Sequence, residues 1–235
     1  MPFYMYYDST YFLVLIGVML SLLASARVKG TFHKYSGIRN SRGMTGAQAA
    51  QQVLNCAGIY DVRIERVAGN LTDHYDPRGK ILRLSDSVYG QTSVAAVGVA
   101  AHECGHAIQH AYGYAPLKFR SVLVPVANFG AQIAWPLILI GLLINSEASW
   151  MIIQIGILAF SLAVLFQIVT LPVEFNASNR AIRILADSGM MYGEEITAAR
   201  KVLNAAAWTY VAGAASAILQ LLRLILLTGG RRRDD

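Results

Sequence analysis

The sequence predicts a mainly α-helical membrane protein with about four transmembrane or membrane-embedded helices and a small region of mixed α and β structure. Its composition is one reason: 55% of the 235 residues are hydrophobic and only 14% are charged, whereas soluble domains carry about 25% charged residues. The other is distribution. The apolar residues gather in long blocks, and a helix needs about 20 apolar residues to cross a bilayer.

Four apolar blocks are expected to form the membrane helices, at about 9–26, 122–145, 150–171 and 205–227. The second and third contain no Lys or Arg and are longer than the helices of about 11–12 residues common in soluble proteins. The fourth is interrupted by Arg223 and rich in small residues. It either spans the membrane or packs against other helices as a partly inserted segment.

Basic residues beside the first three blocks predict an orientation. Lys and Arg follow the first block, precede the second and follow the third, and none lies in the turn at 145–149. Because positive residues favour the cytoplasmic side, residues 27–120 and 172–204 are expected in the cytoplasm. No basic residue precedes the first block, so we expect a retained anchor rather than a cleaved signal peptide.

The net charge of +6 and the two cysteines restrict the expected partners. The positive residues lie mostly beside apolar blocks, which indicates an anionic membrane surface, and no RNA-binding signature or zinc finger indicates nucleic acid. Cys56 and Cys104 form neither a disulfide framework nor a C-x-x-C pair. The lipid bilayer is therefore the first expected partner, and a membrane-protein partner or a homo-oligomer is compatible with the apolar blocks.

The region 27–120 is expected to contain helices and strands. The expected elements are a helix at 45–58, strands at 61–69 and 80–84 after a turn at 76–79, and a helix at 94–111. Thr45 and Gln48 have capping-box spacing, and Ser93 can cap the second helix. Gly58 and Gly113 are placed to end the two helices.

The second of these helices carries the motif His102-Glu103-Cys104-Gly105-His106. Residues four apart lie on one helix face, so His102 and His106 can bind one metal ion. Neutral imidazoles suit zinc, and a catalytic zinc keeps three protein ligands and a water. Glu103 lies about 100° around the helix from His102, where it can act on that water. This division of roles is typical of H-E-x-x-H metallopeptidases.

Two neighbours of the motif are expected to play lesser parts. Cys104 points about 200° away from His102, so we expect a small buried thiol rather than a ligand. His110 lies another turn along the metal-facing side, and we expect it at the rim of the site.

The third ligand has to come from another segment, and Glu174 is the best candidate. Pro172 is well placed to begin a helix at 172–187. On that helix Glu174, Ala177 and Ala181 share one face, with small residues where the metal-binding helix would approach. The rivals are Asp187, Glu194, Glu195 and His74.

The segments "AAHECGHAIQH" and "LPVEFNASNRA", with "LTDHYDP" upstream, strongly resemble the YugP-type neutral zinc metallopeptidases of bacterial membranes. The resemblance covers nearly the whole chain. It implies a single membrane-embedded domain over 1–235, with a zincin-like (gluzincin) catalytic region, in the bacterial inner membrane. More distantly, Glu174–Ser178 resembles the E-x-x-A-D segment of HtpX and the type-I CAAX prenyl proteases. In that group the Glu is the third zinc ligand, which supports Glu174. Ser178 stands where the group has Asp, and Asp187 is the alternative carboxylate.

The expected function is a membrane-embedded zinc endopeptidase acting on membrane or membrane-proximal proteins. One catalytic Zn²⁺ would be held by His102, His106 and Glu174, with Glu103 as general base. An extended substrate can pair with the strand at 80–84. Candidate oxyanion donors are His74, Tyr75, Arg180 and Tyr210.

Two other classes of function fit less well. An inactive scaffold with a structural zinc would usually need four protein ligands. A metal transporter would need ionisable residues in its spans, and the second and third blocks have none.

Overall fold

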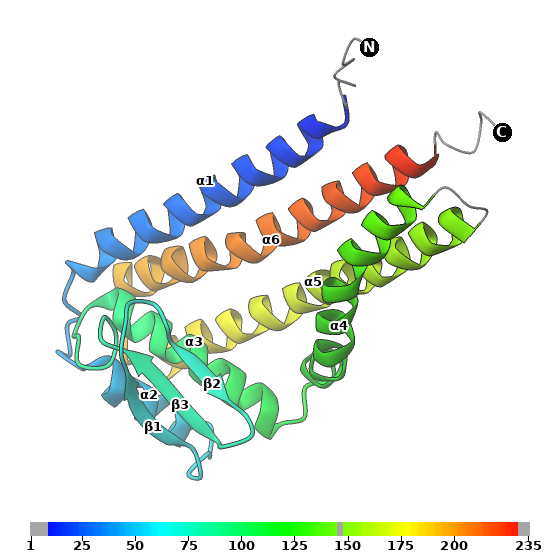
Figure 1. Ribbon diagram of the computed structural model, residues 1–235. Helices are drawn as coiled ribbons and strands as arrows, with labels where there is room; N and C mark the ends of the chain where they lie inside the picture. Colours follow the sequence, from blue (N-terminus) through cyan, green and yellow to red (C-terminus); the bar gives the residue numbers. More distant parts are fainter. Residues whose placement is uncertain (1–8, 145–147, 230–235) are drawn as a thin grey trace. The chain divides into compact units, whose positions relative to one another are not determined.

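The computed structural model describes residues 9–144 and 148–229 (Figure 1). The elements, in chain order, are α1 (Tyr11–Ser36), α2 (Gly46–Cys56), β1 (Arg63–Val67), β2 (His74–Asp76), β3 (Ile81–Ser85), α3 (Val94–Ala111), α4 (Ala115–Leu143), α5 (Ala148–Asp187) and α6 (Glu194–Gly229). Four of these helices, α1, α4, α5 and α6, are long and apolar enough to cross a membrane. The predicted fold class is therefore confirmed.

The chain divides into two compact units. The helical unit comprises 1–23, 120–169 and 210–235, and the mixed unit comprises 24–119 and 170–209. The mixed unit contains α2, α3 and the sheet, together with the adjoining ends of α1, α4, α5 and α6. That both units act as one domain stays a prediction.

The membrane helices extend beyond their apolar blocks. α1 continues to Ser36, α4 begins at Ala115, and α6 begins at Glu194 instead of at 205. The predicted limits were wrong because an apolar block marks the part of a helix that lipid can cover. Backbone hydrogen bonding continues through polar residues until a stop signal interrupts it.

The separate helices predicted at 150–171 and 172–187 are one helix, because α5 runs through Pro172. Proline has no N–H, so one helical hydrogen bond, to the carbonyl of Ile168, is missing. The fixed φ of proline is nevertheless helical, and such interruptions are tolerated in membrane helices. α4 likewise contains Pro125 and Pro136. Most of the turn predicted at 145–149 lies outside the described residues.

Small residues bring helices together in the helical unit. Ser216 of α6 donates a hydrogen bond to the carbonyl of Gly17 in α1 at 2.8 Å. A Cβ on Gly130 of α4 would lie 2.6 Å from the carbonyl oxygen of Ala159 in α5. Such close contacts are typical of helix packing in membranes, where no hydrophobic effect acts between helices.

The sheet of the mixed unit has the strand order β1-β3-β2. β1 pairs with β3 in parallel, and β2 pairs with β3 antiparallel. β2 was not predicted from the sequence. Because β3 is central and paired on both sides, the expectation that the strand at 80–84 pairs with substrate is wrong. The edges belong to β1 and β2.

Both helices predicted inside the mixed unit are confirmed with their capping signals. The side chain of Thr45 accepts a hydrogen bond from the N–H of Gln48 at 3.2 Å, and the side-chain oxygen of Gln48 accepts one from the N–H of Thr45 at 2.9 Å. The hydroxyl of Ser93 accepts from the N–H of Ala96 at 3.1 Å. Gly58 and Gly113 have φ of +69° and +62°, the left-handed conformation that glycine adopts beyond a helix end.

α3 and α5 pack closely together in the mixed unit. A Cβ on Gly105 would lie 2.5 Å from the carbonyl oxygen of Ala177, a distance that no side chain tolerates. Ala177 and Ala181 are both fully buried, as their predicted position on the face toward α3 requires. Glycine at 105 therefore sets how closely the two helices pack.

Gly105→Ala should lower stability, because the added methyl meets backbone that cannot move aside. Overpacking of this kind costs about 1–3 kcal/mol. Gly98→Ala on the same helix is the matched control: its Cβ would lie 3.4 Å from that of Ala199, and alanine favours a helix by about 1 kcal/mol over glycine. Thermal unfolding in detergent should show a lower Tm for Gly105→Ala only. Equal Tm values would contradict the packing argument.

Candidate metal centre

α3 presents His102 and His106 on one face, with ring centroids 4.8 Å apart and planes at 85°. The Nε2 atoms of both rings face one oxygen of Glu174, Oε2, at 3.3 and 3.5 Å. The ligand atoms of the three residues lie within 4.8 Å of one another, so the group can hold a metal ion. The structure therefore brings together the three residues that the sequence predicted as ligands.

The environment of Glu174 fits a cation. Its side chain is 3% exposed, and within the described part of the chain Oε2 has no hydrogen-bond partner. A buried carboxylate oxygen without a partner is costly. A metal ion among the three ligand atoms would remove that cost.

Gln109 fixes the tautomer of His106. The Gln109 side-chain N–H groups donate to the carbonyl of Val173 at 2.8 Å and to Asn176 Oδ1 at 3.0 Å. Its oxygen must then be the atom that faces His106 Nδ1 at 3.1 Å, so His106 carries its proton on Nδ1. The Nε2 lone pair is directed at Glu174, an arrangement that a cation between them makes favourable.

Ser178 makes the corresponding contact to the other histidine. Its hydroxyl lies 3.1 Å from His102 Nδ1. Ser178 therefore occupies the place for which the sequence offered Asp187 as an alternative. Asp187 itself is exposed.

The rival third ligands lie elsewhere. Glu195 accepts hydrogen bonds from the N–H and hydroxyl of Ser41, and Glu194 is exposed. His74 is exposed, and its Nδ1 contacts the carbonyl of Thr72. Among residues 9–144 and 148–229, the candidate metal cluster contains none of the four rivals Glu194, Glu195, His74 and Asp187.

Cys104 and His110 lie as the sequence predicted. The Cys104 thiol is fully buried and contacts the carbonyl of Ala50 at 3.5 Å. Burial raises the pKa of this thiol well above its usual value, so it stays protonated and is a poor ligand. His110 is exposed, and its Nδ1 lies 2.9 Å from the hydroxyl of Tyr75.

Glu103 remains available for chemistry. Its side chain is partly buried, and it makes no hydrogen bond or ion pair with any described residue.

The pKa of His106 shows the charge of the site. Burial alone would lower this pKa, but the neighbouring carboxylates of Glu174 and Glu103 outweigh burial, and the pKa is raised. The site therefore attracts positive charge.

The candidate oxyanion donors differ in their surroundings. Burial, together with Asp61 and Asp76, raises the pKa of Tyr75 to about 12, so its hydroxyl keeps its proton. Arg180 donates to Asn176 at 2.7 Å and lies over the ring of Tyr114. His74 points its Nδ1 at a loop carbonyl, and Tyr210 belongs to the helical unit.

Known proteins share this sequence pattern over almost the whole chain. Residues 10–229 match the family model described as "Putative neutral zinc metallopeptidase". The chain belongs to this family. It is 45% identical over 216 residues to "Putative membrane protease YugP" of Bacillus subtilis (strain 168), which covers 92% of this chain and 95% of that protein. No solved structure matches. The resemblance to the neutral zinc metallopeptidases is confirmed, and the family implies zinc as the metal.

Sequence reasoning missed Gln109 as a partner of the site. The side chain is fully buried and lies three residues after His106, on the same side of α3. A signal was present, because a buried amide one turn from a metal ligand is well placed to orient that ligand.

Glu174→Ala should remove most of the bound zinc, whereas Glu195→Ala should leave it unchanged. The purified protein is expected to hold about one zinc per chain, measured by elemental analysis after dialysis. His102→Ala or His106→Ala should abolish binding, a larger loss than the about 10–100-fold that follows from deleting an outer partner. Full zinc content in Glu174→Ala would move the third ligand to another residue.

Proposed function

We propose that this member of the neutral zinc metallopeptidase family is a membrane-embedded endopeptidase that cleaves membrane or membrane-proximal proteins. One observation carries the proposal. Two imidazole Nε2 atoms converge on a buried carboxylate oxygen that lacks a hydrogen bond, while Glu103, next to one of these histidines in the chain, remains unpaired among the described residues. The first feature suits a bound cation, and the second suits a general base.

His102, His106 and Glu174 would hold the zinc, leaving a position open as in catalytic sites. Bound zinc would supply a Lewis acid that polarises the scissile carbonyl and lowers the pKa of water, so that a base can deprotonate the water for attack. Ser178 and Gln109 orient the imidazoles through their Nδ1 atoms. They hold the ring planes so that both Nε2 atoms face Glu174.

Glu103 would act as the general base. It accepts a proton from the attacking water and returns a proton to the leaving nitrogen as the peptide bond breaks. Its partial burial lets water reach the carboxylate while limiting its solvation. A scaffold with a structural zinc would have no use for such a group.

The substrate would bind in extended form along β2. This strand is at an edge of the sheet, so its outer backbone groups can pair with a peptide. Tyr75, in the middle of β2, contacts His110, which lies one helical turn beyond His106. The protonated Tyr75 hydroxyl is our first candidate for a donor to the developing oxyanion.

A nearby membrane would select the substrate. Large apolar side chains of α1, such as Leu15, Met19 and Leu22, are more than half exposed. Lipid would cover them, and α1 runs without interruption into the mixed unit. Peptides in or beside the bilayer would therefore reach the site more readily than peptides free in solution.

Glu103→Gln should retain zinc and fold but lose hydrolysis. A neutral amide cannot accept a proton from water, and general-base catalysis typically supplies about 10²–10⁴-fold. The measurement is cleavage of a membrane-proximal peptide that the wild-type protein cuts and that a chelator protects. Glu194→Gln, which removes an exposed carboxylate, is the matched control and should keep full activity. Cleavage by Glu103→Gln at the wild-type rate would refute the mechanism.

The orientation is part of the proposal, with the mixed unit in the cytoplasm. Ala148→Cys, at the exposed start of α5, should react with a membrane-impermeant thiol reagent in intact cells. The native Cys56 is exposed in the mixed unit and should react only after lysis. The reverse labelling pattern would refute a cytoplasmic catalytic region.

A further inference from the structure

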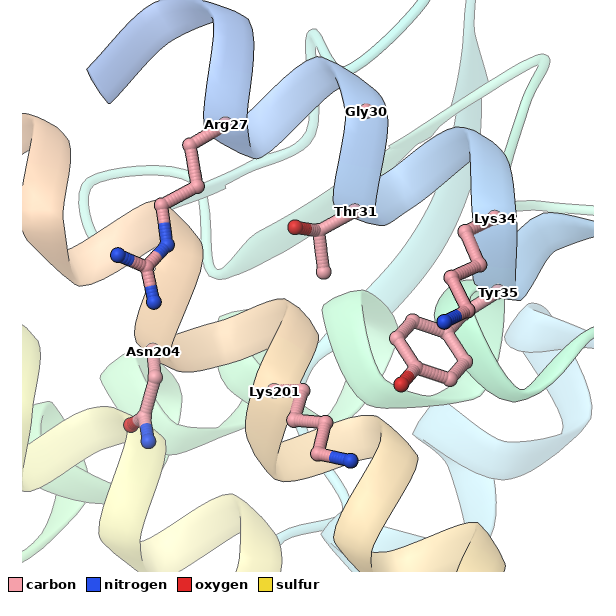
Figure 2. Close-up of a pocket in the computed structure, with 7 residues that line it drawn as sticks. All are labelled: Arg27, Gly30, Thr31, Lys34, Tyr35, Lys201 and Asn204. Carbon is pink, nitrogen blue, oxygen red and sulfur yellow. The ribbon is translucent and has the colours of Figure 1, made fainter. Parts of the chain in front are cut away.

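A second polar site lies in the mixed unit, between α1 and α6. It is a cavity of about 410 Å³, a size within the range of about 300–1,000 Å³ common for small-molecule sites. The lining residues are Arg27, Gly30, Thr31, Lys34, Tyr35, Lys201 and Asn204 (Figure 2). None of the residues proposed to hold zinc or to act on substrate lines it.

The spacing of the lining residues forms the cavity. Arg27, Thr31 and Lys34 are four and three residues apart, so they share one face of α1. Lys201 and Asn204 share a face of α6 in the same way. Figure 2 shows the guanidinium of Arg27 directed from α1 toward α6, near Asn204.

The cavity is positively charged. It is lined by three cationic side chains and no acidic one. None of the ion pairs between described residues involves Arg27, Lys34 or Lys201, although the Lys34 ammonium lies 5.5 Å from the centre of the Tyr35 ring. Three like charges around one cavity repel one another, and a bound anion would relieve that repulsion.

We propose that this cavity binds the phosphate of an anionic phospholipid headgroup. Arginine offers a fork of N–H donors that matches phosphate oxygens, and lysine adds a mobile point charge. The hydroxyl of Thr31 and the amide of Asn204 can complete the hydrogen bonding of the phosphate and the rest of the headgroup.

Both helices place their lining residues at the end of an apolar run. Arg27 is the first charged residue after the apolar run of α1, and Asn204 directly precedes that of α6. Arg27 and Lys34 are about 10 Å apart along a helix axis. This separation is similar to the thickness of the headgroup layer, about 5–8 Å on each side of a bilayer. The positive residues would thus lie at the depth of lipid phosphates, which favours a lipid over a soluble phosphate ester.

Gly30 lines the cavity on the α1 side. A Cβ at this position would meet no atom within 4 Å, so a larger side chain would project into free space without disturbing the backbone. This provides a variant that adds bulk to the cavity wall while leaving every charge in place.

Lipid bound here would stabilise the packing around α3. Lys201 follows Ala199 by two residues, and Ala199 is the neighbour that a Cβ on Gly98 of α3 would touch. A ligand that binds only the folded protein raises its stability. Binding should therefore raise the Tm of the mixed unit.

The test uses the full chain purified in a neutral detergent, so that no charged surface attracts lipid non-specifically. Dispersed short-chain phosphatidylglycerol is titrated and the Kd is measured by native mass spectrometry. Wild-type protein should bind it more tightly than phosphatidylcholine, whose cationic choline opposes the basic cavity. Arg27→Gln with Lys201→Gln should raise the Kd about 30-fold, from about 1 kcal/mol per basic residue.

The matched control is Lys29→Gln with Arg200→Gln. It removes the same charge from the same two helices, at residues that do not line the cavity, and should bind lipid like the wild type. Gly30→Leu should weaken binding with its charge unchanged. Melting without lipid checks that each variant is folded.

Three outcomes would overturn the proposal: equal weakening in the two double variants, wild-type binding by Gly30→Leu, or no preference for phosphatidylglycerol. Equal affinity for glycerol phosphate would overturn the assignment to lipid and identify a soluble phosphate ester as the ligand. The measurement does not depend on hydrolysis, so failure here leaves the proposed peptidase function untouched.

Discussion

The mixed unit depends on one constraint, the burial of the Glu174 carboxylate. The residue is only 2% exposed, and a charge so far from water needs a compensating charge at close range. With its proton on Nδ1, His106 cannot supply it, because the ring then directs a lone pair at the same oxygen. A cation can supply it. The Nε2 atoms of the two imidazoles lie 3.3 and 3.5 Å from Oε2, so one ion could contact all three ligand atoms.

The packing of α3 on α5 follows from this constraint. Glu174 can approach the histidines only if the helix backbones are close together, and Gly105 against the carbonyl of Ala177 permits that distance. Gln109 links the same two helices through Val173 and Asn176. Gln109, which contacts His106, therefore also joins the two helices that carry the candidate ligands, so loss of packing and loss of metal should accompany each other.

The parts of the structure that could be predicted are those set by local chemistry. α3 begins and ends where Ser93 and Gly113 indicated, because a cap and a left-handed glycine act within a few residues. The spacing of the two histidines required only helical geometry. The continuation of α5 through Pro172 could not be read from the sequence in this way, because the neighbours of a membrane helix decide whether a missing hydrogen bond is tolerated.

Features that depend on distant partners were missed for the same reason. β2 is three residues long and exists through its pairing with β3. Gln109 resembles an ordinary helix residue until Val173 and Asn176, more than 60 positions along the chain, supply its partners. The candidate third ligand lay between these extremes: helical periodicity placed Glu174 on a face with small residues, but only tertiary structure brought that face to the histidines.

Ser178 completes the charge balance of the site. With zinc bound, the two positive charges of the ion would be matched by the carboxylates of Glu174 and Glu103, which makes the site neutral overall. Ser178 is 6% exposed, so an aspartate there would place a further negative charge where solvent cannot compensate it. A carboxylate at this position would also make His102 a more basic ligand and draw positive charge away from the metal. The neutral hydroxyl contacts the imidazole without that effect, so a bound metal would keep more of its strength as a Lewis acid. The difference from the E-x-x-A-D pattern therefore changes how the site is charged while still providing a partner for His102.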